Sequence, residues 1–330
     1  MHDKMYSLIH ISWERSILMR HIFIINPAAG KHDISETIRT DIEKICAERN
    51  IDPLIFISEY AGYERDMTRK MCTLFSNEPI RFYSIGGSGT LYQIISGITN
   101  FETTEVACFA SGLTNDLLKC YVGDISAFRS LEKLIDGKTD YLDLIEMGDV
   151  KCPNFISFGL GTGYFSDRFL FRVMSTIAPQ FSYTLGIISD LLCNQIIHYE
   201  IKIDGVEYSN PYALVVCFNG LCMGGSIIPY RSPRPNDGTL NFVLIENMSR
   251  LEQFKTLFAL KAGKTDKIGS KIRMIKGTKM EVARKDGQLL LFNCDGEGEC
   301  STNGSATFRV KPKSLQFIVP REVQILSAEE

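Results

Sequence analysis

Apolar residues in the first 140 positions fall into two alternating patterns. Short apolar runs typical of buried strands occupy residues 22–25, 53–58, 80–84 and 105–110. Between the first two runs, isoleucines recur every three or four positions, at Ile34, Ile38, Ile42 and Ile45, which is the spacing of one helix face. Strands that alternate with helices predict a parallel, doubly wound sheet with helices on both faces. Such sheets bind ligands at the carboxyl ends of their strands, so the turns there are the first candidates for a site.

From about residue 141 the pattern changes and strands dominate. We expect strands at 198–204, 212–218, 239–245, 280–284, 289–293 and 306–310. Asp204-Gly205 and Asp286-Gly287 have the residue types of two-residue hairpin turns. The predicted fold class is therefore α/β plus β, with an N-terminal doubly wound α/β domain, a C-terminal β-sandwich domain and a cleft between them.

Four segments follow from these patterns. Residues 1–18 do not resemble the opening of a fold, and we expect a poorly ordered extension. The α/β domain then spans 19–140 and the β-rich domain 141–310, and we expect the C-terminal segment 311–330 to return to the first domain.

Composition excludes several classes of protein. The formal net charge of −3 gives no support for nucleic-acid binding. The longest apolar stretch, 177–197, is interrupted by Gln180, Asp190 and Asn194, so we predict no transmembrane segment. The first residues lack the apolar core of a secretory signal. None of the ten cysteines lies in a CxxC pair, which favours reduced, buried thiols in a cytoplasmic protein over a zinc site or disulfides.

Two further stretches each allow two interpretations. Nine Lys or Arg lie between Lys261 and Lys285, against only Asp266 and Glu281, which gives the segment a charge of about +7. It is either a solvated face whose lysines protect sheet edges or a surface drawn to the anionic inner face of a membrane. The apolar stretch from Phe165 to Ile197 is either ordinary core or the lining of an acyl-chain slot.

The turn Gly86-Gly87-Ser88-Gly89-Thr90 follows a predicted strand and opens a predicted helix. Glycines there let backbone N–H groups approach an anion, and the helix N-terminus adds favourable partial charge. Two more turns at strand ends carry Asn26-Pro27-Ala28-Ala29-Gly30 and Ser111-Gly112-Leu113-Thr114-Asn115-Asp116. All three turns lie at the strand ends where such sheets bind ligands, which points to a site there.

The order and spacing of these motifs resemble the diacylglycerol kinase catalytic family, which includes bacterial soluble lipid kinases and relatives of sphingosine and ceramide kinases. The resemblance runs from about residue 21 to residue 320. Besides the three turns, the matching elements are Ser58, Asn219-Gly220, Gly224-Gly225, Pro229, Asp237-Gly238-Thr239-Leu240 and Asp295-Gly296-Glu297.

The resemblance implies an ATP-dependent lipid kinase with ATP and Mg²⁺ as cofactors. Its substrate would be a diacylglycerol-like lipid presented at a membrane surface, and a homodimer is left open. The implied nucleotide-binding residues are Asn26, Pro27, Ala28, Ala29, Gly30, Ser58, Gly86, Gly87, Ser88, Gly89, Thr90, Leu113 and Thr114. Asp237 would hold a structural Mg²⁺ with carbonyl oxygens of Arg234 and Thr239, and Glu297 would be the catalytic base, with Asp295 orienting it or helping with metal.

The chain departs from the family pattern in three places. Ser88 stands where the family has an acid, Tyr92-Gln93 stands where it usually has Asn-Glu, and Leu113 stands where it has threonine. A neutral Ser88 predicts weaker Mg²⁺ binding at the triphosphate, which Ser88→Asp would restore. The departures also keep open a catalytically impaired nucleotide- or lipid-binding protein. NAD kinase shares the Gly-Gly-Asp-Gly-Thr turn, but the Asn26–Gly30 turn and the Asp237-Gly238 element favour the lipid kinases.

Overall fold

The computed structural model describes residues 19–159, 197–225, 234–249, 251–252, 255–256, 259, 271–301 and 303–326. The predicted extension 1–18 lies outside these residues. So do Pro229 and the stretch Phe165–Ile197, apart from its last residue.

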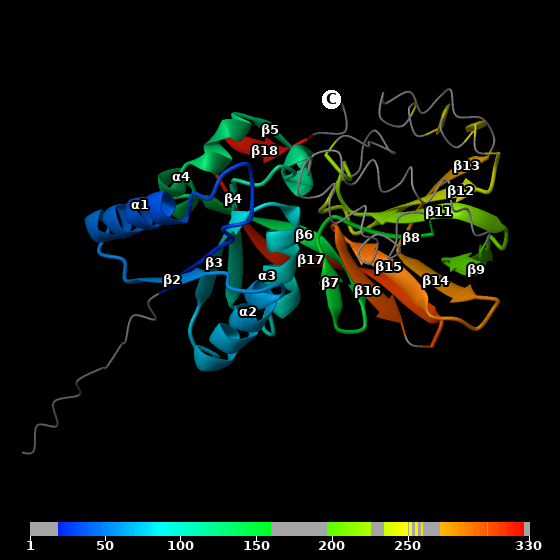
Figure 1. Ribbon diagram of the computed structural model, residues 1–330, viewed down its shortest axis with the longest axis horizontal. Helices are drawn as coiled ribbons and strands as arrows, with labels where there is room; N and C mark the ends of the chain where they lie inside the picture. The colour runs from blue at the N-terminus through cyan, green and yellow to red at the C-terminus, as the bar shows by residue number, and fades with distance from the viewer. Residues whose placement is uncertain are drawn as a thin grey trace, which may run out of the picture.

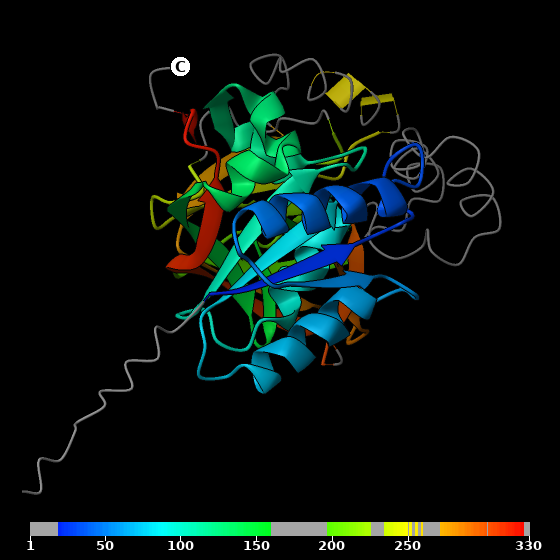
Figure 2. The same ribbon diagram turned by 90° about the vertical axis from the view of Figure 1, so that its left-hand side faces the viewer.

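The first domain is the predicted doubly wound α/β unit. Strands β1 (Arg20–Ile25), β2 (Pro53–Ile57), β3 (Ile80–Gly86) and β4 (Thr104–Ala110) lie in the order β2-β1-β3-β4, and all are parallel. Figures 1 and 2 show α1 (Ser35–Glu48) and α4 (Leu131–Ile135) on one face of the sheet, and α2 (Tyr63–Leu74) and α3 (Ser88–Gly97) on the other. The strands are apolar because both faces are covered.

A long strand, β17 (Ser305–Val319), joins the two domains. Its first half pairs with β14 (Lys279–Arg284), and its second half pairs in parallel with β4. Strand β6 (Lys138–Met147) runs antiparallel along most of β17. After β17 the chain adds β18 (Val323–Ile325), which pairs with β5 (Tyr121–Gly123). The C-terminal segment therefore lies against the first domain.

The second domain is the predicted β-sandwich. One layer contains β8 (Phe155–Gly159), β11 (Pro211–Phe218), β12 (Leu240–Glu246), β13 (Ile272–Gly277), β15 (Leu290–Cys294) and β16 (Glu297–Ser301). The other contains β9 (Ile197–Ile203), β10 (Val206–Glu207), β14 and the first half of β17, and a short β7 (Val150–Cys152) pairs with β6. Buried aromatics fill the space between the layers: Phe158, Tyr199, Phe292 and Phe308. Short 3₁₀ helices at Asp116–Cys120 and Ile125–Arg129 complete the described elements.

One hairpin prediction is confirmed and the other is wrong. Asp204 and Gly205 both have left-handed backbone, with φ of 47° and 86°, and they join the paired strands β9 and β10. Asp286-Gly287 joins β14 to β15, which do not pair and belong to different layers. Its Asp286 instead holds Arg284, 2.6 Å away, in a local ion pair. The hairpin that was not predicted is Asp295-Gly296, with φ of 50° and 102°, between β15 and β16.

The basic segment is neutralised wherever the structure describes it. From residue 271 onward each of its six Lys or Arg side chains lies within 3.5 Å of a carboxylate; the pairs are Lys271–Glu252, Arg273–Glu246, Lys276–Asp237, Lys279–Glu281, Arg284–Asp286 and Lys285–Glu200. Most of these acids come from other parts of the chain. The described half therefore presents little net positive charge, while Lys261, Lys264 and Lys267 lie outside the described residues.

The eight cysteines among the described residues are all buried and unpaired, as the sequence predicted. Burial raises the pKa of the Cys108 thiol to about 12. Among the described helices, none is long and apolar enough to cross a membrane.

Candidate active site

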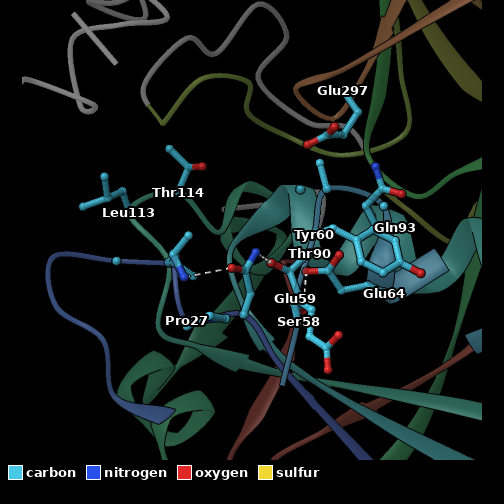
Figure 3. Close-up of a pocket in the computed structure, with 18 of the residues that line it drawn as sticks. Pro27, Ser58, Glu59, Tyr60, Glu64, Thr90, Gln93, Leu113, Thr114 and Glu297 are labelled. Carbon is cyan, nitrogen blue, oxygen red and sulfur yellow. Dashed lines mark hydrogen bonds between the residues drawn. The ribbon is translucent and has the colours of Figure 1, made fainter. Parts of the chain in front are cut away.

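The turns at the carboxyl ends of β1, β2, β3 and β4 enclose a cavity of about 1160 Å³ (Figure 3). Ten of the thirteen predicted nucleotide-binding residues line it, and Glu297 of the second domain does too. The ten are Asn26, Pro27, Ala28, Ala29, Gly30, Ser58, Gly89, Thr90, Leu113 and Thr114. The cavity is large enough for a nucleotide.

Two glycines allow the turns to pack against each other. A Cβ on Gly112 would lie 2.2 Å from the Cα of Gly87, and a Cβ on Gly30 would lie 2.6 Å from the carbonyl oxygen of Ser111. The Gly112 N–H donates to the carbonyl of Gly86 at 2.9 Å. Any larger residue at position 112 would push the two turns apart, so the sequence keeps glycine where backbone meets backbone.

Asn26 links the turn after β1 to the turn after β3. Its side-chain N–H donates to Thr90 Oγ1 at 3.0 Å, and its Oδ1 accepts from the N–H of Ala28 at 3.0 Å. The amide therefore shapes its own turn and ties it to the start of α3. Backbone N–H groups of both turns can then face one anion from two sides.

Glu297 reaches this site from the opposite domain. It is the first residue of β16, directly after the Asp295-Gly296 hairpin turn. A Cβ built on Gly89 would lie 2.9 Å from Glu297 Oε1, so the carboxylate rests against the glycine that opens α3. A reacting group bound at the N-terminus of α3 would therefore lie beside a carboxylate.

Asp295 does not line the cavity. Its carboxylate is buried and accepts from the backbone N–H groups of Phe155 at 3.0 Å and Asn154 at 3.3 Å, at the start of β8. Burial raises the pKa of Asp295 to about 7, and the neighbouring charge of Asp116 acts in the same direction. In this arrangement Asp295 anchors the hairpin that carries Glu297; its role in catalysis stays a prediction.

Ser88, Gly86 and Gly87 also lie outside the cavity wall. The Ser88 hydroxyl donates to the carbonyl of Thr114 at 3.3 Å and accepts from the N–H of Asp116 at 3.1 Å. The Ser88 side chain therefore links the turn after β3 to the turn after β4 and does not line the cavity. It borders a separate small void of about 10 Å³, which Asp295 also lines.

Ser58 lines the cavity, but its hydroxyl hydrogen is already used. It donates to Glu64 Oε1 at 2.8 Å, and Glu64 lies in the first turn of α2. Motif matching pointed to Ser58 and missed Glu64, because nothing local in the sequence marks an acid in a helix's first turn as part of a site.

The cavity wall is rich in acids. Glu59, Glu64 and Glu297 line it, and Gln93 adds an amide; among the described residues Lys31 is the one cation in the wall. The side-chain oxygen of Gln93 is buried and has no hydrogen-bond partner. Carboxylates and amide oxygens are the ligands that Mg²⁺ prefers, so the wall fits a nucleotide carried as its magnesium complex.

Asp237, the predicted ligand of a structural Mg²⁺, already has a cation beside it. Its Oδ2 lies 2.8 Å from Lys276 Nζ, and its Oδ1 accepts from the backbone and hydroxyl of Thr239. Behind it, the buried Asp143 accepts from the N–H groups of Gly238 at 2.7 Å and Lys313 at 2.7 Å. No group of three or more His, Cys, Asp or Glu suited to a metal occurs among the described residues. As arranged, the carboxylate oxygens of Asp237 fit the Lys276 ammonium group better than a divalent ion.

Asp116 and Asn219 were noted in motifs but not assigned to the site, and both connect its parts. Asp116 is buried and accepts from the N–H of Gly225 with both oxygens, at 3.1 and 3.2 Å. Asn219 is buried and donates to the carbonyls of Asp143 and Pro153 at 2.8 Å. Asp116 thus ties the loop after β11 to the first domain, and Asn219 ties the end of β11 to β6 and to the turn before β8.

Two family models match the chain. The model described as the diacylglycerol kinase catalytic domain matches residues 20–147. The model described as the YegS C-terminal NAD kinase beta sandwich-like domain matches residues 170–319.

Similar proteins carry related names. A protein from Staphylococcus carnosus (strain TM300), named as a proposed lipid kinase, is 24% identical over 66% of this chain and 70% of its own length. One from Staphylococcus aureus (strain bovine RF122 / ET3-1), named in the same way, is 24% identical over 73% of this chain and 77% of its own length.

Solved structures share the fold. A proposed diacylglycerol kinase from Bacillus anthracis str. Sterne superposes with a TM-score of 0.68 at 18% identity, over 92% of this chain and 98% of that one. A diacylglycerol kinase from the same strain superposes with a TM-score of 0.61 at 16% identity, over 92% of this chain and 97% of that one.

Proposed function

Because the chain belongs to the diacylglycerol kinase catalytic family and carries a YegS-type C-terminal domain, we propose that it is an ATP-dependent lipid kinase. It would transfer the γ-phosphate of ATP to the hydroxyl of a diacylglycerol-like lipid at the inner face of a membrane. The observation that carries the proposal is the contact between the Glu297 carboxylate and Gly89 at the start of α3.

Phosphoryl transfer depends on positioning and on charge neutralisation more than on covalent help from the protein. The turns at Asn26–Gly30 and Gly89-Thr90 supply backbone donors for the phosphates at one end of the cavity. Glu297 lies beside that end, where it can accept the proton of the lipid hydroxyl as the hydroxyl oxygen bonds to phosphorus. The proton moves to Glu297, and ADP leaves with the electron pair of the broken bond.

Mg²⁺ bound with the nucleotide would neutralise phosphate charge. Of the wall carboxylates, Glu297 supplies hard oxygen atoms near that position, and the three acids together make a metal-free triphosphate unfavourable in this cavity. Among the described residues of the wall, Lys31 is the one cation that offsets them. The wall therefore supports a nucleotide that arrives as its magnesium complex.

A non-catalytic relative is the second candidate, and Ser88 favours it. Its hydroxyl is committed to Thr114 and Asp116, so the third turn presents no acid of its own to the cavity. In that case the cavity would bind a nucleotide without turnover.

The test is transfer of labelled phosphate from Mg²⁺-ATP to diacylglycerol in mixed micelles. Wild type should label the lipid, and Glu297→Gln should lose roughly 10²–10⁴-fold in rate, the usual contribution of a general base, while its melting temperature stays unchanged. Glu207→Gln, at an exposed acid on β10, is the matched control. Nucleotide binding without transfer to any lipid would support the second candidate instead.

A further inference from the structure

We propose that Glu64 binds the ribose hydroxyls of the nucleotide and makes the site specific for ribonucleotides. The inference rests on the proposed function, because it assigns a further residue of the same cavity. It concerns the end of the cavity that is remote from Glu297.

The acid is buried, yet it opens onto the cavity. Glu64 is 4% exposed and lines the cavity wall. Its Oε1 accepts from the Ser58 hydroxyl at 2.8 Å, and the structure gives the carboxylate no other partner among the described residues. Burying a charge is costly unless its hydrogen-bonding capacity is used. Oε2 of Glu64 is therefore the oxygen that can accept a hydrogen bond from a ligand in the cavity.

The position of Glu64 assigns it to the nucleoside and not to the phosphates. Across the sheet the order is β4-β3-β1-β2, so the turn after β2 is separated from the Gly89 turn by β1, about 10 Å at the usual strand spacing. Figure 3 shows Glu64 beside Ser58, and Glu297 on the opposite side of the pocket. Phosphates at Gly89 and Thr90 lie near the reacting end, and the two acids of the β2 turn, Glu59 and Glu64, would repel them.

The donor that suits this acceptor is a ribose hydroxyl. In the Rossmann dinucleotide-binding fold an acid about 20 residues beyond the glycine-rich turn accepts from a ribose hydroxyl, which is a precedent for a carboxylate in this role. Here Ser58 orients the Glu64 carboxylate and leaves one oxygen open, which matches a ribose hydroxyl better than two parallel N–H donors of a base. A bond between a hydroxyl and a carboxylate is charge-assisted and therefore stronger than a neutral one.

The experiment compares ATP with 2′,3′-dideoxy-ATP by calorimetry in Mg²⁺. Wild type should bind ATP roughly tenfold more tightly, which corresponds to about 1.4 kcal/mol. Glu64→Ala should reduce the ratio to about one to two. Glu64→Gln, which keeps the shape and the bond from Ser58 but removes the charge, should reduce it in part. Glu36→Ala removes an exposed first-turn acid from α1, outside the cavity wall, and should keep the wild-type ratio.

The outcomes separate the two proposals. If ATP binds but wild type and Glu64→Gln discriminate equally, the ribose assignment is overturned and the proposed function stands. A preference for GTP over ATP that depends on Glu64 would assign the acid to the base and overturn the inference as well. If the folded wild type binds none of these nucleotides, the proposed function fails together with it.

Discussion

Replacing Asp295 by asparagine should change how stability depends on pH. The Asp295 side chain is buried beneath the hairpin that carries Glu297 and accepts from the N–H groups of Asn154 and Phe155. Asparagine has nearly the same shape, and it tolerates the left-handed backbone at this position, where φ is 50°. The change therefore removes an ionisable group and leaves the hairpin in place.

The sign follows from the direction of the shift. In the folded chain burial raises the pKa of Asp295 from 3.8 to about 7, while in the unfolded chain it keeps its ordinary value. Between about pH 4 and pH 7 the folded state binds a proton that the unfolded state does not bind, so stability falls as pH rises through this window. About three pKa units at 1.36 kcal/mol each give a total loss on the order of 4 kcal/mol.

The assay is urea unfolding of wild type and Asp295→Asn at pH 5, 6, 7 and 8. All other titrating groups are common to both proteins, so the difference between their unfolding free energies isolates Asp295. Asparagine loses one acceptor toward Asn154, which costs roughly 1 kcal/mol at every pH. At pH 5 wild type has already lost about 1.6 kcal/mol, so we expect the variant to be slightly more stable there and clearly more stable at pH 8.

A difference that stays constant from pH 5 to pH 8 would refute this reasoning. It would mean that the bonds from Asn154 and Phe155 stabilise the charged carboxylate as fully as water does. Kinase activity provides a second readout at pH 8: if Asp295 only positions Glu297, Asp295→Asn should keep most of the activity that Glu297→Gln loses.

Two further predictions concern residues that the family pattern singles out. Lys276→Met should lower the melting temperature in the absence of Mg²⁺, and added Mg²⁺ should raise it again, because Asp237 then lacks its cation. Wild type should have the same melting temperature in Mg²⁺ and in EDTA. A lower wild-type melting temperature in EDTA would instead support the structural magnesium. Ser88→Asp should destabilise the protein by roughly 1–3 kcal/mol without tighter Mg²⁺-ATP binding, because the new carboxylate would face the Thr114 carbonyl and share a small void with Asp295; tighter binding by calorimetry would restore the sequence-based expectation.

Local patterns predicted most of the fold, because strand and helix positions depend on near neighbours. The isoleucines at 34, 38, 42 and 45 lie in or beside α1, and the apolar runs became β1 to β4. Asp204-Gly205 formed its hairpin because the flanking strands pair with each other. Asp286-Gly287 did not, since turn residues fix only local dihedral angles, whereas the partners of β14 and β15 are chosen by the packing of two layers.

The site was predictable as far as its backbone turns and no further. The rule that doubly wound sheets bind ligands at strand ends placed Asn26–Gly30, Gly89 and Thr114 together correctly. It could not show which way a side chain points. The Ser88 hydroxyl points away from the cavity because Thr114 and Asp116 offer it partners, and the positive charge of segment 271–285 is offset by acids from other parts of the chain. Both outcomes depend on contacts between residues far apart in the sequence.

The motif departure at Tyr92 has a structural explanation that bears on the kinase proposal. Tyr92 is fully buried and belongs to the aromatic core of the β-sandwich, although it lies on α3 of the first domain. The guanidinium of Arg65, on α2, stacks over its ring at 5.6 Å, a favourable cation–π contact. Helix α3 is therefore held by the second domain as well as by its own sheet. Helix α3 begins at the turn that Glu297 touches. The packing of Tyr92 in the core of the second domain therefore helps to set the distance between the phosphate end of the cavity and the Glu297 carboxylate. The side chain at position 92 thus helps to position the two halves of the site, and its change from the family pattern does not by itself argue against catalysis.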